Sequence, residues 1–223
     1  MSLPKEGNKL SSILIWSGTA LVLVAIVLLV VNFAPLVGSE VSYFVYTQGS
    51  EHYSTDNAVI SEFHKDLGLT DNDVLYDFML FIPKINARSR VLANVNPYDS
   101  TIYYKALESG IAHAEGTPLP GNFGNTFLFA HSGRNFYDGK HQNVQFYLLD
   151  KLTNGDLVYL KYLDKVYKYE ITDTKKVWPG DLQYLTFQNF NYNKLTLMSC
   201  WPAGINYQRQ LVEGKLITAI PFN

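Results

Sequence analysis

The single cysteine of this 223-residue chain, Cys200, is its one candidate for a sulfur nucleophile. It ends the apolar run KLTLMSC (194–200), and Arg209 follows after the loop WPAGINYQ. A thiolate attacks carbonyl carbon. An arginine, always charged and carrying five N–H donors, can stabilise the oxyanion that forms. The pair therefore indicates acyl transfer, and its ordinary alternative is a small core residue beside a surface arginine.

A nucleophilic cysteine also needs a base, because a thiol with an ordinary pKa of about 8.5 is mostly protonated at neutral pH. His131 is the best candidate, since it ends the apolar run TFLFA just as Cys200 ends its own run. The end of a strand is rigid enough to aim a side chain and open enough to admit a substrate. We expect the two strand ends to meet at one mouth of a barrel.

Other histidines and arginines compete for these roles. His113, in GIAHAEG, is the main rival, and we expect it to be a partly buried histidine bonded to the backbone. Arg134, three residues after His131, competes with Arg209 as the cation. The remaining histidines fall in an expected stalk, an outer helix and a polar loop: His52, His64 and His141.

Several function classes lack support. The cysteine and the scattered histidines do not have zinc-ligand spacing, and the chain has no glycine-rich nucleotide-binding motif, so we expect neither a metal nor a cofactor. Ser132 and Ser199 lack a serine-hydrolase elbow. A carboxylate pair of the glycosidase type stays open among 20 acidic residues, although no pattern favours one. Beyond residue 39 the net charge is −3, because only Glu6, Lys5 and Lys9 precede it, so nucleic-acid binding is not expected.

The N-terminus predicts a membrane anchor. Residues 10–39 carry no charge, and the 19 residues of the core run 13–31 would span about 28 Å as a helix, close to a bilayer's hydrocarbon thickness. The run is long for a signal peptide and lacks a small-residue cleavage site, so a cleaved signal is the weaker alternative. Lys5 and Lys9 before the helix and acidic residues after it place the N-terminus in the cytoplasm and the rest outside the cell. An odd cysteine there is an intermolecular link, a buried apolar residue or a reactive thiol.

We expect a cytoplasmic tail (1–10), a transmembrane helix (11–34), a stalk containing a short helix within 54–69 (35–72) and one catalytic domain (73–223). Within that domain the patterns predict a helix over 99–110, a hairpin turning at Leu163-Asp164, and strands that include 126–132, 194–200 and 209–222. Many short strands and few helices indicate a mainly β fold that closes into a barrel.

Residues 77–220 resemble the sortases, the membrane-anchored cysteine transpeptidases of bacteria. TLMSC (196–200) is similar to the family's TLxTC motif, NTFLFAH (125–131) to its histidine block, and Arg209 lies on the following strand as in the family. Lesser matches are IPKI, GIAHAEGTPLPGNFGN and LTNGDLVYL. The resemblance implies an eight-stranded barrel in which Cys200 is the nucleophile, His131 the acid/base and Arg209 the carbonyl or oxyanion ligand.

The resemblance also implies substrates and partners. Cys200 would cleave an LPxTG-like sorting signal through a thioacyl-enzyme, and an amine, from a cell-wall peptide or a pilin lysine, would resolve it. Residues 175–193 would line the substrate groove. Ser199 stands where threonine is usual and bears on substrate binding, and Ala130 stands where glycine is common. The CWPAG loop suggests a class D or E sortase, and we see no carboxylate cluster for the calcium that some sortases need.

Two alternatives remain. An inactive, membrane-tethered barrel that only binds peptides would keep Cys200 buried and unreactive. An L,D-transpeptidase would carry an SHGC-type motif, which LMSCW does not resemble.

Overall fold

The computed structural model describes residues 7–48, 56–66, 77–133, 145–181, 183 and 191–222. The chain divides into two units, residues 1–41 and 42–223. Helix α1 (Gly7–Gln48) makes up the first unit and extends into the second. Its stretch Ser11–Val31 is long and apolar enough to cross a membrane, which agrees with the predicted anchor helix. The apolar side chains of this stretch are exposed, an arrangement that suits lipid rather than water.

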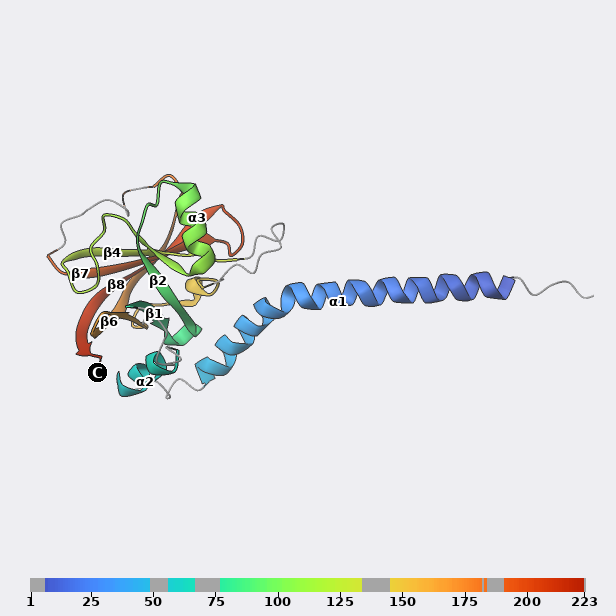
Figure 1. Ribbon diagram of the computed structural model, residues 1–223, viewed down its shortest axis with the longest axis horizontal. Coiled ribbons are helices and arrows are strands. Elements are labelled where there is room, and N and C mark those ends of the chain that lie inside the picture. The colour runs from blue at the N-terminus through green and yellow to red at the C-terminus, as the bar shows by residue number, and fades with distance from the viewer. Residues whose placement is uncertain are drawn as a thin grey trace, which may run out of the picture. The chain divides into compact units, whose positions relative to one another are not determined.

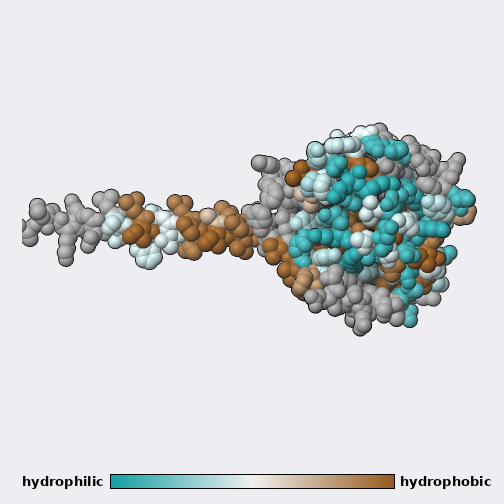
Figure 2. Space-filling model, turned by 180° about the vertical axis from the view of Figure 1, so that it is seen from behind, coloured by the Kyte–Doolittle hydropathy of each residue, from teal (hydrophilic) through white to brown (hydrophobic). Residues whose placement is uncertain are grey.

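The helix continues past the predicted membrane segment, so the first part of the expected stalk is also helical. Figure 2 shows that the surface of α1 is largely apolar, and that the face of the second unit turned to the viewer is mainly polar. Polar and charged side chains are mostly exposed on domains that fold in water.

The second unit is a closed β-barrel, as the sequence predicts (Figure 1). Its strand order is β1-β2-β3-β4-β7-β8-β6-β5, and pairing of β1 with β5 closes the ring. The eight strands are β1 (Phe78–Ile82), β2 (Ala87–Val95), β3 (Ile111–Ala114), β4 (Gly124–Phe129), β5 (Leu157–Tyr162), β6 (Lys165–Val177), β7 (Asn193–Trp201) and β8 (Gln208–Pro221).

Two parallel pairings set the topology, β2 with β3 and β4 with β7. A parallel pairing needs a crossover, and α3 (Ser100–Ser109) provides the one between β2 and β3. The carboxylate of Asp99 caps α3 by accepting from the N–H groups of Thr101 and Ile102. The helix stops at Gly110, where a Cβ would lie 2.6 Å from the carbonyl oxygen of Arg90.

The other predicted elements also form. Tyr162 pairs with Lys165, so the hairpin turns at Leu163-Asp164 as expected. The predicted outer helix is α2 (Asp56–Asp66). Short 3-10 turns follow β1, at η2 (Pro83–Ile85), and precede β5, at η3 (Leu149–Lys151).

The barrel wall has an apolar interior and two helix-covered outer faces. Side chains alternate between the two sides of each strand, so Leu128 and Leu197 point inward while their neighbours point outward. One outer face lies under α2, where Val59 and Phe63 pack against β1, β5 and β6. The other lies under α3 and is built from residues of β2, β3, β4, β6 and β8 with Ala106 and Leu107 of the helix.

Candidate active site

Cys200 and Arg209 are direct cross-strand neighbours. Strands β7 and β8 run antiparallel, and their register pairs Cys200 with Arg209 at the end of the ladder. The loop between the strands returns the chain so that the guanidinium comes back beside the sulfur. Residues opposite each other in an antiparallel pair have Cβ atoms about 4.5–5.5 Å apart.

His131 reaches the same level of the barrel from the other side of β7. Strands β4 and β7 are parallel and in register up to Phe129 with Met198, and the Ala130 N–H donates to the Met198 carbonyl at 3.1 Å. Continuing that register sets His131 beside Cys200. β7 therefore lies between the strand that leads to the histidine and the strand that carries the arginine.

All three side chains project from the outer face of the wall under α3. Side chains two positions apart on a strand point to the same side. Cys200 therefore points to the side of Met198, His131 to that of Phe129, and Arg209 to that of Leu211. The apolar members of these pairs pack in the cluster beneath α3. The site is therefore on the outside of the barrel wall, at the ends of the strands.

A pocket of about 290 Å³ opens here, lined by His131, Cys200 and Arg209 together with Ser199. Tyr103, Tyr104 and Leu107 of α3 form one wall. Residues of the predicted groove segment 175–193 also contribute: Val177, Trp178, Pro179 and Asp181. The rest of that segment includes residues 182 and 184–190, which lie outside the described residues.

A family model for the sortase domain matches residues 80–217. The chain belongs to the sortase family. A comparison with curated proteins gave no match. Among solved structures, a pilus-related sortase C of Group B Streptococcus is 29% identical with a TM-score of 0.53, and the match covers 63% of this chain and 66% of that chain, just under two thirds of it.

Two further structures are similar. Sortase C-1 from Actinomyces oris is 26% identical with a TM-score of 0.53, covering 71% of this chain and 82% of that chain. The Clostridium perfringens sortase D5 transpeptidase is 25% identical with a TM-score of 0.51, covering 81% of this chain and 100% of that chain. Two sortases A, from Listeria monocytogenes and Corynebacterium diphtheriae, share the fold at 20% identity.

Burial sets the protonation of the sortase site. It raises the pKa of the Cys200 thiol, and the positive charge of Arg209 offsets part of that rise. Burial also lowers the pKa of His131, opposed by the charge of Glu108. Both shifts favour the uncharged forms, so the resting site holds a thiol and a neutral imidazole.

The His131 ring stacks on Tyr104 of α3, with centroids 6.1 Å apart and planes 19° apart. Its Nε2 is buried without a hydrogen-bond partner among the described residues. The backbone is held separately, because the His131 carbonyl accepts from the Phe146 N–H at 3.2 Å. The imidazole is thus fixed by stacking while one ring nitrogen stays available.

The β7–β8 loop touches both sides of the site. Asn206 Oδ1 accepts from Arg209 Nη1 and from the Cys200 thiol, the latter at 3.9 Å. The Gly204 N–H donates to Ser132 Oγ at 3.4 Å. A Cβ on Gly133 would lie 2.4 Å from the Gly204 Cα, so only glycine permits this approach of the two loops.

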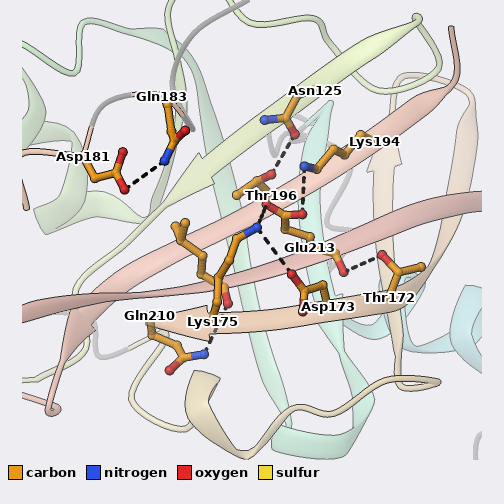
Figure 3. Close-up of polar contacts among 11 residues, drawn as sticks. Asn125, Thr172, Asp173, Lys175, Asp181, Gln183, Lys194, Thr196, Gln210 and Glu213 are labelled. Carbon is orange, nitrogen blue, oxygen red and sulfur yellow. Dashed lines mark hydrogen bonds and ion pairs between the residues drawn. The ribbon is translucent and has the colours of Figure 1, made fainter. Parts of the chain in front are cut away.

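A polar cluster continues along the same outer face, away from the pocket. Figure 3 shows Glu213 of β8 between Lys194 of β7 and Lys175 of β6, at 2.8 and 2.9 Å. Thr196 of β7 donates to Asn125 of β4 at 2.8 Å. These contacts tie β7 to both neighbours and help to hold the register that aligns the site.

The main rival histidine does not line the pocket. His113 is fully buried; its Nδ1 accepts from the Asn94 N–H at 3.2 Å, so its Nε2 carries the proton and donates toward the Pro118 carbonyl at 3.3 Å. The predicted backbone bonding is confirmed, whereas the residue is completely buried and not partly buried as expected. Three candidates and one side chain lie outside the described residues: His52, Arg134 and His141, and the side chain of His64.

Tyr104 and Asn206 line the pocket and were not predicted from the sequence. Tyr104 lies on α3, and the path of the β2–β3 crossover decides which face of the barrel this helix covers. Local periodicity does not specify that path. Asn206 lies three residues before Arg209, and that proximity was the only available signal. Among the described residues, no group of three His, Cys, Asp or Glu side chains is placed to hold a metal ion.

Proposed function

We propose that this sortase is a cysteine transpeptidase that cleaves an LPxTG-like sorting signal and transfers the new acyl end to an amine. The observation that carries the proposal is the register of three adjacent strands, which lines Cys200, His131 and Arg209 along one pocket. Sortases are transpeptidases, and the Clostridium perfringens structure is named as one. The acceptor is a cell-wall peptide or a pilin lysine.

Acylation uses each of the three groups once. The scissile carbonyl accepts from the Arg209 guanidinium, and Cys200 Sγ attacks the carbonyl carbon while the thiol proton passes to His131. The tetrahedral oxyanion is stabilised by Arg209. The C–N bond then breaks, and the His131 imidazolium gives its proton to the departing amine, which leaves a thioacyl-enzyme.

Transfer reverses the roles. The acceptor amine attacks the thioester carbonyl and gives a proton to His131. The C–S bond breaks, and the sulfur recovers the proton from the imidazolium. Because a thiol and a neutral imidazole dominate at rest, the reactive thiolate–imidazolium form is a minor one, and the rate should follow a bell-shaped pH profile.

The full-length protein in detergent, mixed with LPxTG-like peptides and an amine, tests the proposal by mass spectrometry. We expect a covalent acyl adduct on Cys200 and an aminolysis product, both lost in Cys200→Ala. His131→Ala should abolish turnover. In His113→Ala, activity per folded molecule should persist, although loss of a buried histidine reduces stability. Cleavage that survives Cys200→Ala would contradict the nucleophile assignment.

The inactive, peptide-binding alternative expects a buried and unreactive cysteine. Cys200 is partly exposed and lines the pocket, which supports the transpeptidase over that module.

The membrane topology is part of the same proposal. Residues 1–10 lie in the cytoplasm, 11–34 span the membrane, 35–72 form the stalk and 73–223 act outside the cell. Because Cys200 is the only cysteine in the sequence, a membrane-impermeant maleimide reports on it alone. Labelling in intact cells is expected, and labelling only after permeabilisation would reverse the topology.

A further inference from the structure

Asn206 makes the two contacts that a substrate carbonyl would make. Its side-chain oxygen accepts a hydrogen bond from Arg209 Nη1. The same oxygen lies 3.9 Å from the Cys200 sulfur, at the long end of the range for a hydrogen bond from a thiol. The carboxamide therefore lies at the pocket, between the sulfur and the guanidinium.

The chemistry of that group matches the substrate's. An asparagine carboxamide and a peptide bond are both amides, with a carbonyl oxygen that accepts from a guanidinium. Under the proposed function, on which this inference rests, the scissile carbonyl must lie against Cys200 Sγ and accept from Arg209. Two carbonyl oxygens cannot fill one position.

We propose that Asn206 is an internal stand-in for the substrate amide, occupying the acyl-oxygen position of the free enzyme and leaving it when the sorting signal binds. The residue is then a positioning and gating residue of the acylation site. It is not a catalytic residue, because it leaves before the bond-making step.

The loop that carries Asn206 is anchored at its base. The Gly204 N–H donates to Ser132 Oγ, and the Ile205 N–H donates to the Pro202 carbonyl at 2.9 Å. The close approach of Gly133 to Gly204 ties the loop to the end of the histidine strand. Asn206 itself is exposed, so its side chain can leave by rotation while the loop base stays in place.

Displacement costs little. A hydrogen bond between groups that water can reach contributes little net free energy, because water can replace either partner, and a bound peptide can offset the loss with its own contacts. Until the peptide arrives, Asn206 stabilises the thiol over the thiolate and keeps the guanidinium occupied. The consequence is a cysteine that reacts more slowly without substrate than it would if Asn206 were absent.

Alkylation by iodoacetamide across pH tests the thiol contact without any peptide. It is run on the full-length protein in detergent, where Cys200 is the only thiol. Asn206→Ala should move the alkylation profile to lower pH by about 0.5–1 unit, which is roughly three- to tenfold faster alkylation below the thiol pKa. Asn206→Asp, nearly the same shape but negative, should move it to higher pH. Asn122→Ala, an exposed asparagine outside the pocket, is the matched control and should leave the profile in place.

Peptide kinetics test the displacement. Asn206→Ala should lower KM for cleavage several-fold without lowering kcat, because substrate no longer competes with the side chain. Asn206→Asp should raise KM, since its carboxylate pairs with Arg209. An alkylation profile unchanged or moved upward in Asn206→Ala, or a KM unchanged or raised in that variant, overturns the inference. The alkylation result stands even if Cys200→Ala shows that the proposed function fails, so the two failures are distinguishable.

Discussion

Each of the two outer faces of the barrel has a helix packed on it, but the pocket lined by polar groups that could react lies on the face under α3. Under α2, Val59 and Phe63 are buried against Met79, Phe81 and Tyr159, and the face is closed by apolar packing. Under α3, Ala106 and Leu107 cover only part of the wall, and Tyr103 and Tyr104 stand at the edge of a pocket. A helix can therefore seal one side of a barrel and build a reaction site on another.

The position along the strands explains the difference. The α2 face is made from buried residues of β1, β5 and β6 that have a strand partner on both sides. The α3 face runs on to where β4, β7 and β8 end, so loops meet there and polar side chains become available. Chemistry occurs where regular pairing ends and burial is incomplete.

Cys200→Ala should have the largest effect on activity, and it acts on the α3 face. Removing the nucleophile should lower peptide cleavage by at least about 10³-fold, because no other described group lining the pocket supplies a thiolate. Thermal unfolding should hardly change. Cleavage is followed by chromatography of the peptide products, and residual turnover near the parent rate would contradict the role of the sulfur.

Phe63→Ala, on the α2 face, should reduce stability and leave the activity of the folded protein unchanged, which is the reverse of the effect expected for Cys200→Ala. Phe63 is 1% exposed and packs edge-on to Phe81 with centroids 6.2 Å apart. Its truncation should lower the free energy of unfolding by about 3–5 kcal/mol, as expected for a buried phenylalanine. Denaturant unfolding measures the loss, and the cleavage rate per folded molecule should remain that of the parent. A large fall in that rate would mean that the two faces are coupled.

Arg209→Gln separates charge from packing at the pocket. Losing an oxyanion donor typically costs about 2.7–4 kcal/mol, or about 10²- to 10³-fold in rate. The cation also holds the pKa of Cys200 below the level that burial alone would give, so its removal raises that pKa further. The iodoacetamide profile should therefore move to higher pH, and a shift to lower pH would contradict the assigned electrostatics.

Tyr104→Ala tests the wall that α3 contributes, with the smallest expected effect. Stacking between aromatic rings adds about 0.5–1.5 kcal/mol beyond burial, so kcat/KM should fall about two- to tenfold as His131 loses its support. Tyr104→Phe keeps the ring and should retain the parent value. If both variants fall equally, the hydroxyl rather than the ring is responsible.

Most of the elements could be predicted because their signals are local. Period-two alternation marked the β5–β6 hairpin, helical spacing marked α2, and Asp99 and Gly110 marked the ends of α3. The contacts of Tyr104 and Asn206 could not be predicted, since they join segments whose approach depends on the closed barrel. The position of the site on the outer face followed from strand parity only once the register was fixed.

Local properties of the chain specify the types of element, the apolar anchor helix and the order of histidine, cysteine and arginine. Hydrophobic period and chemical type are properties of neighbouring residues, so they can be read without a fold. The parallel pairing of β4 with β7, about 70 positions apart in the chain, and the pairing of β7 with β8 are known only from the folded barrel. These pairings depend on how all eight strands close into one ring, and they bring Cys200, His131 and Arg209 to one pocket.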